Sequence, residues 1–435
     1  FTTGKTKNLD IPFFEMLRKA TFEKQILSIA SRRCFSVGNF ADQDVVVVSI
    51  ARTPIGKLGG ALASLPAPKL GSHVISAAVD RAGIAKDEIE EAFIGNVVSA
   101  NVGQAPARQA VIYAGLDLDT PCTTINKVCA SGMKAVMLSS LSLMSGYRSV
   151  CVAGGMESMS NIPYYLPGAR TGYRLGNNTV VDGLVNDGLW DVYNNQHMGN
   201  CGEICANAYN ITREEQDDFA IQSYERAAAA WAAGKFGTEV VPISIAGKRG
   251  KEPTLLEKDE EFGNIQLDKL RSLRPAFAKE GTVTAANASK LNDGAAAMVL
   301  VTGKYAREHQ LSPLFKIRGF GDAAKDPVEF TTAPADAVPR ALQHAGVSLQ
   351  DVDYHEINEA FSVVALANAK ILDLDLAKVN AHGGAVALGH PIGCSGARII
   401  GALYGVLKAN DATIGCASIC NGGGGASAMV IERLS

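Results

Sequence analysis

A layered α/β fold built from two similar α/β/α halves is predicted for this 435-residue sequence. Strand and helix patterns alternate along the chain, which is typical of such folds. Short patterns from the first third recur in the same order in the last third, and the stretch between them differs in composition. We therefore expect an α/β protein in which a loop domain is inserted between two related halves.

The first half begins with the stretch 44–60, DVVVVSIARTPIGKLGG, in which an apolar run leads into a turn. Such a run predicts a strand that is covered on both faces and ends in a turn. A helix follows near residues 68–82, and the stretch 90–98, EEAFIGNVV, is another candidate for a buried strand. The order of strand, helix and strand supports the α/β class.

The two halves share three sequence patterns: an Ala-Gly pair with an acidic turn and a strand, a Cys-Ser-Gly group at a helix start, and a short apolar strand that ends in glycines. Chance similarity between short α/β segments is the alternative, but three matches in one order make it less favoured. The paired segments are 82–98 with 345–361, 123–136 with 389–400, and 149–158 with 412–427.

These patterns suggest boundaries for the halves and for the insertion. The N-terminal half is expected to comprise residues 41–161 plus 283–307, and the C-terminal half residues 308–435. Residues 162–282 are expected to form a loop region that carries binding residues. Within it, Thr212 and Glu215 form a predicted capping box at the start of a helix.

The N-terminal residues 1–40 have a different composition. From Met16 onward they are rich in Arg, Lys and Ser, contain a single acid and show apolar residues at helical spacing, as mitochondrial transit peptides do. Met16 is the expected natural start, and a disordered tail without a targeting signal is the alternative. The chain is therefore expected in the mitochondrial matrix.

Composition argues against several classes of protein. The formal net charge is −3 and the basic residues are spread along the chain, so nucleic acid is not expected as a ligand. No apolar run approaches the roughly 20 residues of a membrane-spanning helix. Nine cysteines at irregular spacing fit a reducing compartment and free thiols, and zinc is disfavoured because Cys201 and Cys205 lack a second pair.

Cys129 is the first candidate for catalysis. It lies in TTINKVCASGMKAV, where a β-branched segment runs into the start of a predicted helix. The positive end of the helix dipole would lower the pKa of the thiol and favour a nucleophile. The alternative is a small buried residue that only packs.

Three further motifs lie in the last quarter of the chain: HEINEAF with Asn358, GGAVALGHPIGCSGAR with His390, and CASICNGGGGASA with Cys420. Each alone has a structural explanation, as a turn or a core residue. Together with Cys129 they supply what acyl transfer to a thiolate requires: a base, a second thiol to move a proton, and glycine N–H groups for an oxyanion hole.

The motifs NKVCASGMKA, NEAF, GHPIGCSGAR and CNGGGGASA resemble the active-site motifs of the thiolases and occur in that family's order. The resemblance extends from Val45 to the C-terminus and includes RTPIGKLGGALASL, VGQAPARQA, AGGMESMS, HMG and TVTAANASKLNDGAAA. It implies the thiolase fold, with mixed sheets in the two halves. The mitochondrial acetoacetyl-CoA subtype is the most similar, which implies reversible Claisen condensation of two acetyl-CoA to acetoacetyl-CoA and free coenzyme A.

The resemblance implies a role for each motif residue. Cys129 matches the nucleophile that becomes acetylated, His390 the base that activates it, and Cys420 the residue that moves the proton of the second substrate. Asn358 matches the group that holds a water which, with His390, stabilises the enolate. The backbone N–H groups of Cys129 and Gly422 match the second oxyanion hole.

Binding residues are implied in the same way. His197, Ser289 and, in a loosely matching stretch, Lys269 correspond to contacts with coenzyme A; a solvated surface charge is the alternative for Lys269. A potassium ion is implied as well, and backbone carbonyls are suitable ligands for it. Only Tyr224 carries a side-chain signature for the ion, and a core tyrosine is the alternative there. The potassium ligands implied are Tyr224, Ala285, Ala286, Ala288 and Val386.

Three other functions remain open from sequence. The main rival is a degradative 3-ketoacyl-CoA thiolase that acts on longer chains. A non-catalytic acyl-CoA carrier on the same scaffold is less favoured because Cys129, Asn358, His390 and Cys420 are all present. A redox thiol switch is the third. The family analogy also implies a homotetramer.

Overall fold

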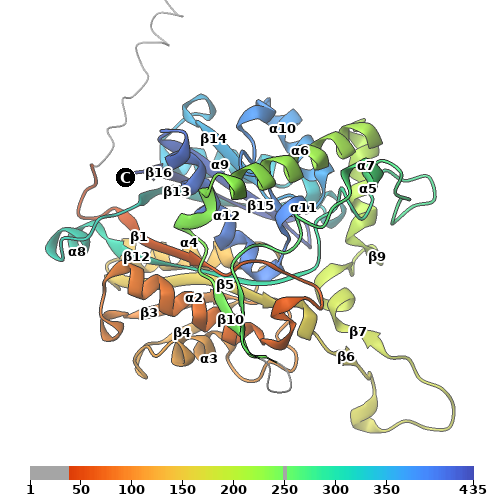
Figure 1. The fold of residues 1–435 in the computed structure, drawn as a ribbon, viewed down its shortest axis with the longest axis horizontal. Helices are drawn as coiled ribbons and strands as arrows, with labels where there is room; N and C mark the ends of the chain where they lie inside the picture. The colour runs from red at the N-terminus through yellow and green to blue at the C-terminus, as the bar shows by residue number, and fades with distance from the viewer. Residues whose placement is uncertain (1–38, 248–251) are drawn as a thin grey trace, which may run out of the picture. The chain divides into compact units, whose positions relative to one another are not determined.

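The computed structural model describes residues 39–247 and 252–435 (Figure 1). The predicted transit peptide therefore lies outside the described residues, apart from its last two positions. Among the residues described, no helix has both the length and the apolar character needed to cross a membrane. The eight cysteines of the described part of the chain are free thiols.

A single ten-stranded mixed sheet runs through both halves of the chain, in the order β14-β15-β16-β13-β1-β12-β5-β3-β4 with β2 beside β12. The strands are β1 (Val45–Arg52), β2 (Gly56–Lys57), β3 (Glu91–Gly95), β4 (Cys122–Ile125), β5 (Val150–Ser158), β12 (Asn292–Thr302), β13 (Phe315–Ala324), β14 (Tyr354–Ile357), β15 (Ile414–Asn421) and β16 (Gly425–Arg433).

The two halves of this sheet have the same connectivity. In the first half β3 is parallel to β5, which is antiparallel to β12, which is antiparallel to β1. In the second half β14 is parallel to β15, which is antiparallel to β16, which is antiparallel to β13. The half-sheets join where Val45–Val47 pairs with Phe315–Ile317. The predicted pair of similar mixed-sheet halves is thus confirmed.

Two helices lie between the half-sheets: α4 (Ser131–Met144) and α12 (Ile392–Ala409). Figure 1 shows them in the middle of the molecule, between the orange strands and the blue ones. They cross at two glycines, because a Cβ on Gly132 would lie 2.8 Å from the nitrogen of Ala397, and one on Gly396 would lie 2.4 Å from the nitrogen of Met133. This close approach places the N-terminal ends of both helices in one region.

The core between the half-sheets fixes these two helices. Met133 and Val136 of α4 pack with Ile399 and Leu403 of α12 and with inward-facing residues of both half-sheets. A second core lies on the outer side of the first half, where helices α2 (Ala67–Ala82) and α3 (Pro106–Tyr113) cover the sheet. On the second half, α9 (Pro334–Ala345) packs on β13 and β16, with α10 (Ser362–Leu372) beside it.

Residues 162–282, which were expected to form a loop region, contain several helices and strands. The long helix α6 (Arg213–Ala232) begins as predicted: Glu215 N–H donates to Thr212 Oγ1 at 3.2 Å, and Thr212 N–H donates to Glu215 Oε2 at 2.6 Å. Helix α5 (Met198–Ala208) was not predicted, because its Gly and Asn residues are poor helix formers.

The remaining elements are short. Helix α7 (Leu267–Leu270) belongs to the inserted region, while α8 (Gly303–Glu308) and α11 (Ala385–Leu388) follow it in the chain. Three two-stranded ribbons complete the inserted region. They are β6 (Tyr164–Tyr165) with β7 (Val181–Asp182), β8 (Trp190–Asp191) with β9 (Gln196–His197), and β10 (Ile243–Ile245) with β11 (Thr254–Leu256).

Candidate active site

Cys129 lies on a tight turn between β4 and α4. The preceding residue, Val128, has φ +46°, a left-handed conformation that is strained for a β-branched residue. Two side chains hold the turn: Asn126 Oδ1 accepts from Val128 N–H at 3.0 Å, and Ser131 Oγ accepts from Lys127 N–H at 2.8 Å and donates to the Val128 carbonyl at 2.6 Å. The turn thus fixes Cys129 immediately before the helix.

The thiol of Cys129 is protonated at rest. Burial raises its pKa to about 11, and the negative charge of Glu157 acts in the same direction, although a hydrogen bond from Gly422 N–H lowers it in part. The sequence-based expectation of a lowered pKa is therefore wrong: desolvation by the surrounding protein outweighs the effect of the helix end. A thiol of this kind needs a base to become a nucleophile.

His390 precedes α12 and is buried, with one ring orientation fixed by its neighbours. Its backbone N–H donates to Asn292 Oδ1 at 2.9 Å. Ser395 Oγ donates its only hydrogen to the Pro391 carbonyl at 3.0 Å, so at 2.6 Å from His390 Nδ1 it acts as the acceptor. We therefore assign the ring proton to Nδ1, which leaves the lone pair on Nε2, 3.5 Å from Asn358 Nδ2.

His390 is neutral at physiological pH. Burial is the main cause and lowers the pKa of the imidazole to about 3, and the positive charge of Arg398 contributes. A neutral ring with its Nε2 lone pair free of a proton is in the state that a general base requires.

Asn358 follows β14 and is buried in the same region. Its backbone N–H donates to the Ser418 carbonyl at 2.9 Å, which ties the loop to β15. Its side-chain Oδ1 has no hydrogen-bond partner within the described residues. A buried amide oxygen of this kind is a ready acceptor for a bound water or a ligand group.

The neighbouring Glu359 anchors the loop that carries Asn358. Its carboxylate accepts from Asn380 Nδ2 at 2.8 Å, from Ser223 Oγ at 2.8 Å and from Val386 N–H at 3.0 Å. The chain passes so close that a Cβ on Gly384 would lie 2.3 Å from the Glu359 carboxyl carbon. Glu359 is therefore a positioning residue, and sequence reasoning gave it no role.

Cys420 is the next-to-last residue of β15 and is fully buried. Burial raises the pKa of its thiol well above the usual range, and a charge on Cys129 acts in the same direction. The glycines after Cys420 form the turn into β16. Gly424 has φ +87°, and a Cβ there would lie 2.2 Å from the Lys325 carbonyl oxygen, so this position requires glycine.

A cavity of about 310 Å³ is lined by His390, while Cys129, Asn358 and Cys420 are not among its lining residues. Cys129 packs against the hydrophobic cluster that contains Met159 and Ile392, both of which line the cavity. Most of its walls are apolar, with a few polar groups, which is typical of a site for an organic ligand. Lining residues include His197, Phe277, Ser289, Phe361, His390 and Ile392.

Known proteins are similar to this chain in sequence and in fold. The N-terminal thiolase domain matches residues 45–304, and the C-terminal thiolase domain matches residues 311–433. The chain belongs to the thiolase family. Acetyl-CoA acetyltransferase 1 of Arabidopsis thaliana is 58% identical over 394 residues, which cover 90% of this chain and 95% of the relative.

Two further matches are informative about this thiolase. The mitochondrial acetyl-CoA acetyltransferase of Bos taurus is 56% identical over 392 residues, which cover 90% of this chain and 92% of the relative. A thiolase from Ascaris suum, solved in complex with coenzyme A, has a TM-score of 0.85 and 44% identity, and the match covers 90% of this chain and all of that one. Proteins named as mitochondrial and as cytosolic both occur among the relatives.

The residues predicted to contact coenzyme A in this thiolase fall in different places. His197 caps α5, stacks on Phe277 with ring centroids 4.8 Å apart, and lines the cavity together with Ser289. Because His197 Nδ1 accepts from Gly199 N–H at 3.0 Å, its proton is on Nε2, which is free to donate to a ligand. Lys269 is exposed on α7 and does not line the cavity.

The predicted potassium ligands of this thiolase include two backbone carbonyls that the side chain of Lys290 contacts. Tyr224 is buried, and its Oη donates to the Ala286 carbonyl at 3.4 Å. The ammonium group of Lys290 donates to the carbonyls of Ala285 at 2.6 Å and Ala288 at 3.0 Å. Two of the oxygens expected to hold a potassium ion therefore already hold a cationic side chain.

Sequence reasoning missed three residues that shape the thiolase site. Asn292 accepts a hydrogen bond from the backbone N–H of His390, and Ser395 sets the tautomer of that ring. Lys290 donates to the carbonyl of Ala285. All three lie inside motifs that were recognised as thiolase-like. The only signal in the sequence is the presence of polar residues at the ends of predicted buried elements, which is a weak one.

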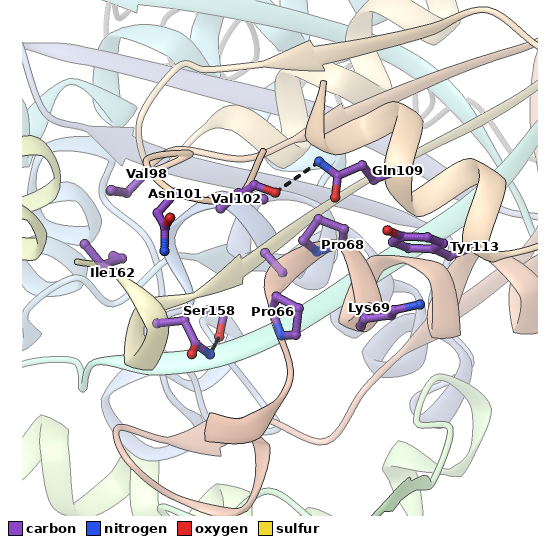
Figure 2. Close-up of a pocket in the computed structure, with 12 residues that line it drawn as sticks. Pro66, Pro68, Lys69, Val98, Asn101, Val102, Gln109, Tyr113, Ser158 and Ile162 are labelled. Atoms are coloured by element: carbon purple, nitrogen blue, oxygen red, sulfur yellow. Dashed lines mark hydrogen bonds between the residues drawn. The ribbon is translucent and has the colours of Figure 1, made fainter. Parts of the chain in front are cut away.

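A second cavity, of about 280 Å³, lies between α2 and α3 (Figure 2). Gln109 Nε2 donates to the Val102 carbonyl at 3.0 Å on one wall, and Lys69 Nζ lies 3.5 Å from the centre of the Tyr113 ring on another. None of the predicted catalytic or binding residues lines it. The first cavity is the candidate active site because His197, Ser289 and His390 line it.

Proposed function

We propose that this thiolase is an acetyl-CoA C-acetyltransferase, which reversibly condenses two acetyl-CoA into acetoacetyl-CoA and coenzyme A through an S-acetyl-cysteine. The proposal is supported by His390, which has a neutral imidazole and lines the cavity, and by Cys129, which packs against two other residues of the cavity wall, Met159 and Ile392. The names of the relatives, which match 90% of the chain, support the substrate.

In the first half-reaction, Cys129 attacks the thioester carbon of one acetyl-CoA while His390 Nε2 takes the Sγ proton. The N–H groups of Cys129 and Gly422 then stabilise the oxyanion of the tetrahedral intermediate. The leaving thiolate takes a proton from Cys420, and coenzyme A departs as the thiol.

In the second half-reaction, the Cys420 thiolate removes a proton from the methyl group of another acetyl-CoA. Its raised pKa makes it a strong base, as this weakly acidic carbon requires. The enolate oxygen is stabilised by the protonated His390 and by a water on Asn358 Oδ1. The enolate carbon attacks the acetyl group, and the Cys129 thiolate that leaves recovers its proton from His390, which restores the resting state.

The test is a thiolysis assay on acetoacetyl-CoA, 2-methylacetoacetyl-CoA and 3-ketopalmitoyl-CoA. We expect the short substrates to react and the long one to be a poor substrate. Turnover of the long substrate alone would replace the proposal with a degradative 3-ketoacyl-CoA thiolase. No turnover of any of them would favour a carrier, and reversible oxidation of a cysteine pair under mild conditions would favour a thiol switch.

Replacing Asn358 with alanine is expected to lower the steady-state condensation rate about 10²–10³-fold, because one stabilising group of the enolate is removed. Acetylation of Cys129 does not form an enolate and is expected to continue. The first burst of coenzyme A released from acetyl-CoA measures acetylation, and the slower release measures turnover. Asn264→Ala, which changes an exposed asparagine away from the cavity, is the control. Equal loss of both phases would contradict this role.

The mitochondrial location, the homotetramer and the coenzyme A contact of Lys269 stay predictions. The relatives include proteins named for the mitochondrion and for the cytosol, so the location depends on the predicted transit peptide. The potassium ion is an expectation of the resemblance alone, and the contacts of Lys290 argue against it.

A further inference from the structure

Lys290 lies between the loop 284–289 and β12, and its ammonium group is enclosed by groups that attract a cation. The ammonium group carries three hydrogens that it can donate. Nζ donates to the carbonyls of Ala285 at 2.6 Å and Ala288 at 3.0 Å, and it lies 5.7 Å from the centre of the Tyr224 ring, within range of a cation–π contact. The side chain therefore folds back onto its own loop instead of extending into solvent.

These contacts do not fit a potassium ion at the same place. The carbonyls of Ala285 and Ala288 are two of the expected ligands, and both accept from Lys290. The carbonyl of Ala286 accepts from Tyr224 Oη at 3.4 Å. A potassium ion on these oxygens would lie beside the ammonium group, and the two positive charges would repel each other in a partly buried site.

We propose that the Lys290 ammonium group replaces the monovalent cation in this enzyme and holds the loop 284–289 in position without potassium. An ammonium group is similar in size to a dehydrated potassium ion and is bound by the same kind of oxygen. Because it is covalently attached to the chain, its local concentration does not depend on the medium.

A carboxylate also favours a cation at this place. Glu261 attracts the Lys290 ammonium group electrostatically. Its Oε1 is held by Asn292 Nδ2, which donates to it at 3.2 Å.

The clamped loop borders both the cavity and the catalytic loop. Ser289 lines the cavity, and its backbone N–H donates to the Ala360 carbonyl at 3.0 Å. Ala288 pairs with Phe361, which lies three residues after Asn358. Lys290 itself lines the cavity, and through these contacts it positions the wall that receives the substrate. Its removal is therefore expected to affect KM more than kcat.

The experiment compares the wild-type protein with Lys290→Ala in potassium, ammonium and choline salts at equal ionic strength. For the wild type we expect the same unfolding temperature and the same KM for acetoacetyl-CoA in all three. In choline, Lys290→Ala is expected to unfold about 2–4 °C lower and to show a KM about tenfold higher, because a charged hydrogen-bonding group is lost. Potassium or ammonium is expected to restore both values.

The unfolding measurements do not depend on the proposed acetyl-transfer function, while the KM measurements do. Lys258→Ala, which removes an exposed lysine, controls for the loss of one charge and is expected to behave as the wild type. A wild-type protein that becomes more stable or more active with potassium would overturn the proposal. So would a Lys290→Ala protein that is unchanged in choline, or one whose defect neither cation restores, since Lys290 would then only fill space.

Discussion

Cys129→Ala is expected to lose about 10⁵-fold or more in the rate of acetoacetyl-CoA thiolysis, comparable to the loss of a catalytic nucleophile elsewhere. Without the thiol no acetyl-enzyme forms, and the two remaining reactive groups, His390 and Cys420, have no covalent intermediate to act on. The rate is measured by the disappearance of acetoacetyl-CoA. Mass spectrometry after incubation with acetyl-CoA should show an acetylated peptide for the wild type and none for the variant.

Cys122→Ala is the matched control for this result. Cys122 is another partly buried free thiol, seven residues earlier in the chain on β4. We expect the control to keep its activity and its acetylated peptide. If Cys129→Ala retained a substantial part of the wild-type rate, Cys129 would be a packing residue and the covalent mechanism would be wrong.

Cys420→Ala is expected to separate the two half-reactions. Condensation and thiolysis should fall about 10²–10⁴-fold, the usual contribution of a general acid or base. Acetylation of Cys129 from acetyl-CoA should persist, because a departing thiolate needs a proton far less than a carbon acid needs a base. The variant should therefore accumulate acetyl-enzyme, which is measured by trapping the protein with acid and determining its mass.

Cys416→Ala provides the control for Cys420→Ala, because it removes a buried free thiol from the same strand, four residues earlier. It is expected to cost stability through a small cavity but to leave the ratio of acetylation to turnover unchanged. Equal loss of acetylation and turnover in Cys420→Ala would mean that the two thiols do not have separate tasks.

Much of the fold follows from local patterns. The apolar run at the start of the first half became β1, the helix near 68–82 became α2, and Thr212 with Glu215 formed the predicted capping box. The repeated segments became β3 and β14, α4 and α12, and β5 and β15, in equivalent places of the two half-sheets. Each of these depends on residues that are neighbours in sequence, so periodicity and capping are sufficient to find them.

Features that depend on long-range packing were not accessible from sequence. A helix start predicts a lower thiol pKa for Cys129, but the burial that raises it comes from residues distant in the sequence, among them Val97, Met159 and Ile392. Similarly, Ser395 sets the tautomer of His390 only because the turn after Pro391 folds back on the ring. The role proposed for Lys290 depends on carbonyl directions, which no side chain reveals.

The duplicated sheet has a consequence for how this enzyme can change. Cys129, His390 and Cys420 lie in the two repeated halves, whereas His197 and Phe277, which line the cavity, come from the inserted region 162–282. Part of the cavity wall is thus encoded in a separate stretch of the gene from the reactive groups. Variation in the intervening stretch can alter which acyl groups are accepted while the reactive groups stay in register.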